Sequence, residues 1–86
     1  RPLISVVVPA YNAEQTLAFT IASLGRERDT KFECIIVNDG STDSTRALAD
    51  DLARRDARVR VVHQPNRGLA GARNTGIEHA RGDLLY

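Results

Sequence analysis

The sequence predicts an α/β fold, in which an open parallel sheet is flanked by helices. Two short apolar runs, Ile4–Val8 and Cys34–Val37, are rich in β-branched residues and lack polar alternation. Such runs are typical of strands that are buried on both faces of a parallel sheet. Each run is followed by a polar turn and then by apolar residues at helical spacing, so the chain repeats a β-α unit with right-handed crossovers.

The first unit begins with a strand over Ile4–Val8. We expect Pro9 to end this strand, because proline cannot donate a hydrogen bond to the ladder. Asn12 follows at a short turn and is expected to cap the next helix with its side-chain oxygen. The apolar face of that helix, at spacing i, i+4 and i+7, is formed by Leu17, Ile21 and Leu24.

The second unit places an acidic residue at the end of its buried strand. Asn38-Asp39-Gly40 has the residue types of a sharp turn. Ser41 or Thr42 is expected to cap the following helix, and Asp43 to lie in its first turn, where the helix dipole favours negative charge. Asp39 would then lie at the carboxyl end of the strand, which is the edge where ligands bind in open α/β sheets.

The third unit is less regular. Arg58–Val62 alternates in part and predicts a strand with one wetter face or edge, and residues 64–68 predict a loop. A helix is expected over residues 70–80, although it contains Gly71 and Gly76. An interior glycine costs about 1 kcal/mol relative to alanine, so a close approach to the sheet or to a ligand is the expected reason for both.

The length indicates part of a domain. The chain has 86 residues, whereas a complete α/β domain usually has roughly 100–200. Asp83-Leu84-Leu85-Tyr86 reads as the opening of another strand. We therefore expect residues 1–86 to be the N-terminal part of one larger domain.

The charge and the single cysteine exclude several classes of protein. A net charge of +1 with interspersed signs gives no argument for nucleic-acid binding. No apolar run is long enough to span a membrane, and no signal-peptide pattern occurs in this stretch. One cysteine, Cys34, cannot form an internal disulfide and fits a reducing compartment. We expect it to be a buried, inert residue, and the protein to be cytoplasmic, with membrane association of a longer parent left open.

Several familiar sites are absent from the sequence. There is no phosphate-binding P-loop, and no glycine-rich turn follows the first strand, so an NAD-type domain with Asp39 as its ribose acid is disfavoured. A receiver-type signalling domain would need clustered acids after the first strand, where Glu14 stands alone. His63 and His79 lack metal-ligand spacing and are expected at a strand end and on a helix surface.

Two polar turns remain, at the ends of strands that would be neighbours. Their polar and aromatic residues are Tyr11, Asn12, Glu14, Asn38, Asp39 and Ser41. An aromatic ring beside a carboxylate suits a nucleoside, because the ring can stack on the base and the carboxylate can accept from base or ribose donors. The same residues could equally serve only as turn formers and helix caps, and the pattern alone leaves the two interpretations about even.

Three stretches resemble the motifs of glycosyltransferase family 2. They are the opening run Ile4-Ser5-Val6-Val7-Val8-Pro9-Ala10-Tyr11-Asn12-Ala13-Glu14, the second-strand motif Val37-Asn38-Asp39-Gly40-Ser41-Thr42-Asp43, and a third segment of pattern N-x-G-x-x-x-A-R-N-x-G at residues 66–76. Each motif alone is moderately specific. Three in the family's order cover nearly the whole chain, which makes the resemblance highly specific.

The resemblance implies the N-terminal half of a GT-A fold, a Rossmann-like sheet with strand order third, second, first, fourth. It also implies a nucleotide-sugar donor, often a UDP-sugar, and inverting transfer to a hydroxyl of a saccharide, lipid or other acceptor. Carried over by position, the turn of Pro9, Ala10 and Tyr11 would contact the base and ribose, with Tyr11 packing on the base. Asp39 would hydrogen-bond the base, and Glu14 and Arg73 would lie near the nucleotide or its phosphates.

The resemblance also implies what this stretch lacks. In the family a D-x-D motif after the next strand binds a divalent metal, Mg²⁺ or Mn²⁺, and the catalytic base lies later still. Neither falls within the 86 residues, so we expect no catalytic and no metal-binding residue here, and no activity from this chain alone. The alternative is a non-catalytic α/β module used for nucleotide binding or assembly.

Overall fold

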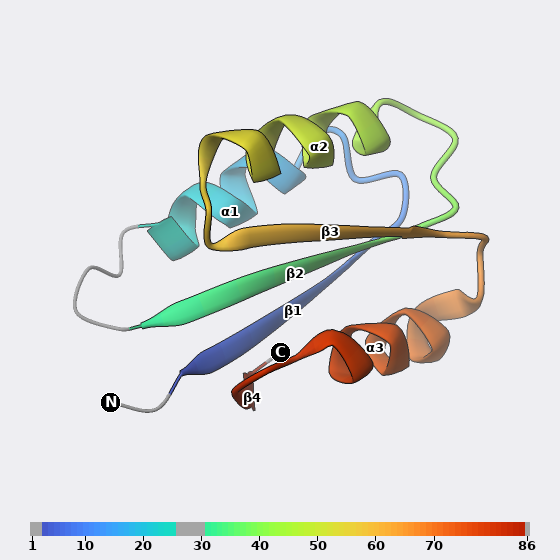
Figure 1. Cartoon of the computed structure of the whole chain (residues 1–86). Coiled ribbons are helices and arrows are strands. Elements are labelled where there is room, and N and C mark those ends of the chain that lie inside the picture. The colour runs from blue at the N-terminus through green and yellow to red at the C-terminus, as the bar shows by residue number, and fades with distance from the viewer. Residues whose placement is uncertain (1–2, 26–30, 86) are drawn as a thin grey trace.

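The computed structural model describes residues 3–25 and 31–85, which form one four-stranded parallel sheet with helices on both faces (Figure 1). The strand order is β3-β2-β1-β4. The elements are β1 (Ile4–Ala10), α1 (Leu17–Gly25), β2 (Phe32–Asp39), α2 (Thr45–Arg55), β3 (Val59–Gln64), α3 (Gly68–His79) and β4 (Asp83–Leu85). The predicted fold class and strand order are confirmed.

Side-chain alternation along β2 divides the core into two layers. Helices α1 and α2 cover one face of the sheet and α3 covers the other (Figure 1). Cys34 and Ile36 pack in the layer beneath α1 and α2, whereas Ile35 and Val37 pack beneath α3. Since the period of a strand is two, Asp39 continues the second set and faces α3. The end of the buried strand therefore presents a carboxylate to the α3 side of the sheet.

Gly76 explains how closely α3 approaches the sheet. A Cβ atom at this position would lie 2.2 Å from Cγ1 of Val7 on β1. No side chain fits there, so glycine is required at the contact despite its cost within a helix. The close approach expected for this glycine is confirmed, and the neighbour is the sheet. For Gly71 the expectation was wrong, because a Cβ atom there would meet the side chain of Arg67, at 2.6 Å, and not the sheet.

The prediction that Pro9 ends the first strand was wrong. β1 continues to Ala10, with Pro9 in register with Val37 of β2. Proline has no N–H to donate, but pairing with β2 continues through Pro9 to Ala10 opposite Asn38.

The predicted helix caps were also wrong. Asn12 has a φ of 48° and α1 begins only at Leu17. α2 begins at Thr45, after Ser41 and Thr42, so the prediction that Asp43 lies in its first turn was wrong as well. The strands are longer than predicted, because parallel pairing carries β2 through Asp39. Gly40, with a φ of 71°, then makes the turn.

The ends of the strand and the helix in the third unit also differ from the predicted ones. Gln64, expected in a loop, is the last residue of β3, where it pairs with Asp39. α3 begins at Gly68, earlier than expected. β4 confirms the strand predicted near residue 83. In the part of the chain that the structure describes, no helix has the length and apolar character needed to cross a bilayer.

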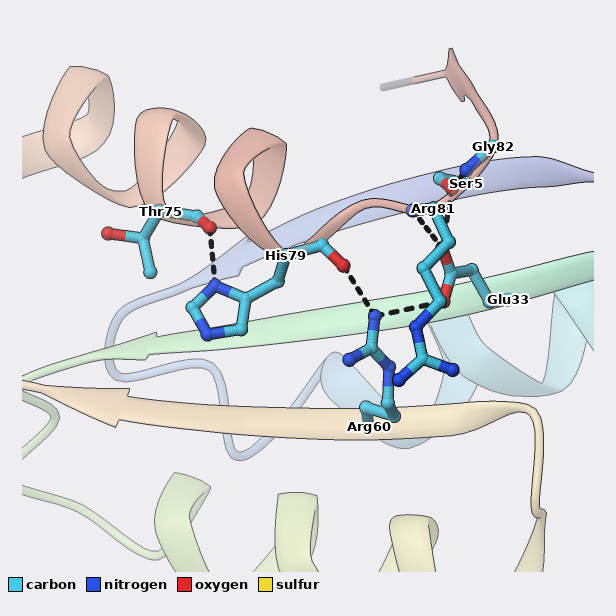
Figure 2. Close-up of polar contacts among 7 residues, drawn as sticks. All are labelled: Ser5, Glu33, Arg60, Thr75, His79, Arg81 and Gly82. Carbon is cyan, nitrogen blue, oxygen red and sulfur yellow. Dashed lines mark hydrogen bonds and ion pairs between the residues drawn. The ribbon is translucent and has the colours of Figure 1, made fainter.

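A buried carboxylate, Glu33, ties the end of α3 to the sheet (Figure 2). It is 8% exposed, and its Oε2 accepts from Ser5 Oγ and from the Arg81 backbone N–H, both at 2.6 Å. Its Oε1 accepts from Arg60 Nη2 at 2.9 Å, and Ser5 Oγ accepts from the Gly82 N–H at 2.8 Å. This group, the Glu33 cluster, joins three strands to the α3–β4 connection at the amino end of the sheet.

Candidate functional site

The candidate site lies at the carboxyl edge of the sheet, on the side covered by α3. The last residues of β1, β2 and β3 are neighbours there, with Ala10 opposite Asn38 and Asp39 opposite Gln64. A pocket of about 240 Å³ opens beside them. It is lined by Pro9, Ala10, Tyr11, Asp39, Asn66, Gly68, Leu69 and Ala72. This is the edge at which open α/β sheets bind their ligands.

Asp39 is a buried but well hydrogen-bonded carboxylate that lines this pocket. It is 3% exposed, and its Oδ1 accepts from Gln64 Nε2 at 2.9 Å and from the Arg67 N–H at 2.8 Å. Burial alone would raise the pKa of Asp39, but the hydrogen bonds from Gln64, Arg67 and Gly68 and the charge of Arg67 lower it below its usual value. Asp39 is therefore ionised at neutral pH and can only accept hydrogen bonds.

Tyr11 supplies an aromatic surface at the mouth of the pocket. It follows β1 directly and is 55% exposed, although a large apolar ring usually gains from burial. The exposed ring and the Asp39 carboxylate border the same pocket. The two groups that the sequence paired for nucleoside binding are thus brought together.

Asn12 and Ser41 do not face the pocket but join the two turns at the sheet edge. Asn12 Oδ1 accepts from the Thr42 N–H at 2.8 Å, and the Asn12 N–H donates to Ser41 Oγ at 3.0 Å. The Ala13 N–H donates to Thr45 Oγ1 at 2.8 Å. For these two residues the interpretation as turn formers is the one that the geometry supports.

The carboxylates of Glu14 and Asp43 also join these two turns, because each accepts from a backbone N–H group of the other turn. The Glu14 N–H donates to Asp43 Oδ2, and Glu14 Oε2 accepts from the Ser44 N–H at the start of α2, both at 3.4 Å. Asp43 Oδ1 also accepts from the Thr45 N–H at 2.9 Å. The carboxylate of Glu14 therefore lies at the start of α2, and Glu14 is not among the residues that line the pocket.

Four of the six predicted site residues line the pocket, namely Pro9, Ala10, Tyr11 and Asp39. Arg73 is exposed on α3 and, like Glu14, is not among the lining residues. The structure adds Asn66, Gly68, Leu69 and Ala72, which sequence reasoning did not assign to the site. The signal for them was present, because they belong to the third motif, and the β3–α3 connection must end at the same edge of the sheet.

Gly40 allows the second and third loops to meet beneath the pocket. A Cβ atom on this residue would lie 2.6 Å from the backbone nitrogen of Asn66. Asn66 Nδ2 in turn donates to the Asp39 carbonyl oxygen at 3.2 Å. Both the positive φ of Gly40 and this contact require glycine, so the pocket floor depends on it.

The other titratable groups are placed as structural residues. Cys34 is fully buried, and burial, with the charge of Asp56, raises the pKa of its thiol to about 12, so it stays protonated. His63 accepts from Asn38 Nδ2 through Nδ1 at 2.9 Å and lies 2.8 Å from Asp50 through Nε2. His79 lies on α3 and donates to the Thr75 carbonyl oxygen.

No metal site competes with the pocket in residues 3–25 and 31–85, where no three His, Cys, Asp or Glu side chains gather as ligands. A larger groove of about 490 Å³ lies between β1 and α1, and its only polar side chains are hydroxyls. It is lined by Val6, Val7, Val8, Pro9, Phe19, Thr20, Ser23 and Leu24. It carries no group with acid, base or anion-binding chemistry.

Comparison with known sequences identifies relatives over almost the whole chain. Residues 5–86 match the family described as "Glycosyl transferase family 2". The protein named "Uncharacterized glycosyltransferase EpsJ" from Bacillus subtilis (strain 168) is 52% identical over 84 residues. That alignment covers 98% of this chain and 24% of the relative, so the chain spans about a quarter of that protein's length.

Solved structures give the same result for the fold. The mannosyltransferase PcManGT from Pyrobaculum calidifontis, in complex with GDP-Man and Mn²⁺, is similar with a TM-score of 0.84 and 31% identity, over 95% of this chain and 25% of that one. S. aureus TarS 1–349 in complex with UDP-GlcNAc has a TM-score of 0.82 and 31% identity, again over 95% and 25%. The described sheet and helices therefore match one part of each of these larger enzymes.

Proposed function

Because the chain belongs to glycosyltransferase family 2, we propose that residues 1–86 form the N-terminal, donor-binding part of a single glycosyltransferase domain. The complete protein would transfer a sugar from a nucleotide-sugar donor to an acceptor hydroxyl, with inversion at the sugar. This stretch would bind the nucleoside half of the donor. A pocket of about 240 Å³ supports that division, since a site for a whole ligand is typically about 300–1,000 Å³.

The observation that carries this proposal is the meeting of Tyr11 and Asp39 at one pocket. The ring of Tyr11 would stack on the base, while Pro9 and Ala10 would contact the base and ribose. An ionised carboxylate at the pocket floor would accept a hydrogen bond from the base. Gln64 and the Arg67 N–H each donate to Oδ1 of Asp39. We therefore assign Oδ2 of Asp39 to the base.

The protonation state of Asp39 favours particular bases. Uracil and guanine carry a ring N–H that can donate to a carboxylate, whereas cytosine and adenine present an unprotonated ring nitrogen at that position. The two similar structures hold UDP-GlcNAc and GDP-Man, whose bases are of the first kind. We propose UDP-sugars as the donor class.

Glu14 and Arg73 have less direct roles in this proposal. Arg73 lies on α3 one turn beyond Leu69, which lines the pocket, and would approach the donor phosphates. Glu14 would act through the turn that carries Tyr11, because its carboxylate lies at the start of α2. A direct contact of Glu14 with the nucleotide stays a prediction.

Transfer requires chemistry that this stretch does not supply. The charge of the leaving diphosphate must be neutralised, commonly by a divalent metal, and a base must deprotonate the acceptor hydroxyl. We propose that both functions come from residues after position 86, with Mg²⁺ or Mn²⁺ as the metal. The acceptor would be a saccharide, a lipid or another hydroxyl compound, and the complete protein would work in the cytoplasm, with membrane association as one possibility.

Calorimetry with UDP tests the proposal on the 86-residue chain and on the complete protein. Asp39→Asn is the informative variant. Its side-chain oxygen can still accept from Gln64 and Arg67, but its NH₂ group would replace Oδ2. We expect affinity for UDP to fall by about 1–3 kcal/mol, with a relative gain for CDP, whose ring nitrogen accepts.

The outcomes separate the proposal from the non-catalytic alternative. UDP binding to the complete protein that Mn²⁺ strengthens, together with the base preference of Asp39→Asn, would support a donor site. Binding without any effect of metal, and without transfer activity, would favour a non-catalytic binding module. If neither protein bound any nucleotide, the donor-site proposal would be wrong.

A further inference from the structure

Behind Asp39 a chain of hydrogen bonds runs from the sheet to α3. Gln64 Nε2 donates to Asp39 Oδ1 at 2.9 Å, and Gln64 Oε1 accepts from Thr75 Oγ1 at 2.6 Å. Thr75 is 8% exposed on the sheet-facing side of α3. Neither Gln64 nor Thr75 lines the pocket, so each would affect a ligand only through Asp39.

The Gln64 amide has only one favourable orientation in this series of hydrogen bonds. An amide has a donor end and an acceptor end, and a carboxylate can only accept. Turning the Gln64 amide over would place Oε1 against an oxygen of Asp39. In the observed orientation the Thr75 hydroxyl, which also lies 3.0 Å from the Gly71 carbonyl oxygen, satisfies Oε1.

We propose that Gln64 and Thr75 are positioning residues for the base of the donor. Together with the Arg67 N–H they hold Oδ1 of Asp39, so that Oδ2 is the oxygen presented to the pocket. This inference rests on the proposed donor site and deepens it, since it names residues that no ligand needs to touch.

The charges around Asp39 agree with this assignment. Gln64 is the leading cause that lowers the pKa of Asp39 against the effect of burial. Arg67 is the charged side chain that acts on Asp39. Glu14 and Asp43 bind backbone N–H groups at the neighbouring turns, and His63 lies against Asn38 and Asp50. Loss of the Gln64 donor should therefore raise the pKa of Asp39 and move the acid limit of UDP binding to higher pH.

Two variants and a matched control test the chain of bonds. Gln64→Met removes the donor with little change in length, and Thr75→Val removes only the hydroxyl. Thr20→Val is the control, because Thr20 Oγ1 donates to a carbonyl oxygen four residues earlier, at 3.1 Å, and has no hydrogen bond to a glutamine. Thr75→Ser keeps the hydroxyl and should behave as the unmodified chain.

The measurements are an NMR pH titration of the Asp39 carboxyl carbon and UDP affinity by calorimetry, on the full 86-residue chain. We expect Gln64→Met and Thr75→Val to raise the pKa of Asp39 and to weaken UDP binding roughly 3- to 10-fold. Thr20→Val and Thr75→Ser should change neither value.

The two readouts separate failure of this inference from failure of the proposed function. If UDP binds and Thr75→Val changes neither the Asp39 titration nor the affinity, the positioning role is refuted while the donor site stands. If the Asp39 titration shifts but neither the 86-residue chain nor the complete protein binds UDP, the donor site fails, and the positioning role in binding fails with it.

Discussion

Two acidic residues on the same face of β2 show how position decides the use of a carboxylate. Glu33 and Asp39 are separated by six residues and both lie beneath α3, and both have a pKa below the usual value despite burial. Glu33 lies at the amino end, where protein donors occupy both of its oxygens. Asp39 lies at the carboxyl end, beside a pocket, and Gln64 and the Arg67 N–H both donate to its Oδ1. Only the second arrangement suits a ligand.

At the residue scale, Tyr11 is predicted to contribute to binding and hardly to stability. Its ring is 55% exposed, so Tyr11→Ala removes little buried area. If the ring stacks on the base, the variant should lose about 0.5–1.5 kcal/mol of affinity for UDP, measured by calorimetry.

Tyr11→Phe is the matched control, because it keeps the ring and removes only the hydroxyl. It should bind UDP nearly as well as the unmodified chain. Equal affinities for the alanine and phenylalanine variants would contradict a stacking role for Tyr11.

At the scale of elements, the start of α2 is held both by Asp43, just before it, and by Glu14 of the neighbouring turn. Ser44 precedes α2 without a side-chain cap bond, and the Ser44 N–H instead reaches Glu14 of the preceding unit. Asp43 returns the contact to the Glu14 N–H. Orphan donors at the start of a helix need a partner, and here the two turns supply partners to each other. The turn that carries Tyr11 is therefore held by the turn that follows Asp39.

The Glu33 cluster makes a stability prediction at the same scale. Glu33→Gln would place an NH₂ group against either Arg60 or the donors from Ser5 and Arg81. We expect the free energy of unfolding to fall by about 1–3 kcal/mol at pH 7, measured by urea denaturation. Asp51→Asn is the control, because its ion pairs with the exposed Arg54 and Arg55 should be worth about 0–1 kcal/mol.

The pH dependence of this effect has a definite sign. Burial alone would raise the pKa of Glu33, but hydrogen bonds from Ser5, Arg81 and Arg60 and the charge of Arg60 lower it overall. Its contribution is therefore complete above the unfolded-state pKa of about 4.3 and is lost as the pH falls through the lower folded-state value. The gap between the unmodified chain and Glu33→Gln should shrink below about pH 4. A gap that stayed constant down to pH 2–3, roughly the range below that unfolded pKa, would contradict this account.

At the scale of the whole molecule, the chain resembles one part of a larger enzyme. It covers 24% of its relative from Bacillus subtilis and 25% of the mannosyltransferase structure that holds GDP-Man and Mn²⁺. The apolar groove is lined by residues of β1 and α1, and it shares Pro9 with the pocket beside Asp39.

Metal dependence should distinguish the chain from the complete protein. In the described residues no three potential ligands lie together, so removing Mn²⁺ with a chelator should leave UDP affinity of the 86-residue chain unchanged. In the complete protein the same treatment should weaken UDP binding at least several-fold, because a bound metal would offset the charge of the diphosphate. Equal responses in the two proteins would place the metal-binding residues elsewhere than we propose.

The sequence by itself determined the fold class, the order of elements and four of the residues at the pocket. Continuous apolar runs that alternate with helical patterns are typical of a parallel sheet, and the three motifs identified the family that fixes the strand order. The close approach of α3 at Gly76 was also predictable, because an interior helix glycine costs about 1 kcal/mol and needs a steric reason.

The tertiary structure alone decided the ends of the elements and the partners of the polar side chains. Pro9 remains in β1 because β1 pairs with β2 as far as Ala10, and Asn12 joins two turns because Thr42 lies within reach. Gln64 meets Asp39 through strand register and Thr75 through the packing of α3. Local propensity indicates which turns, caps and strands a residue favours. A hydrogen bond between residues far apart in sequence depends on distances that only the packed chain sets.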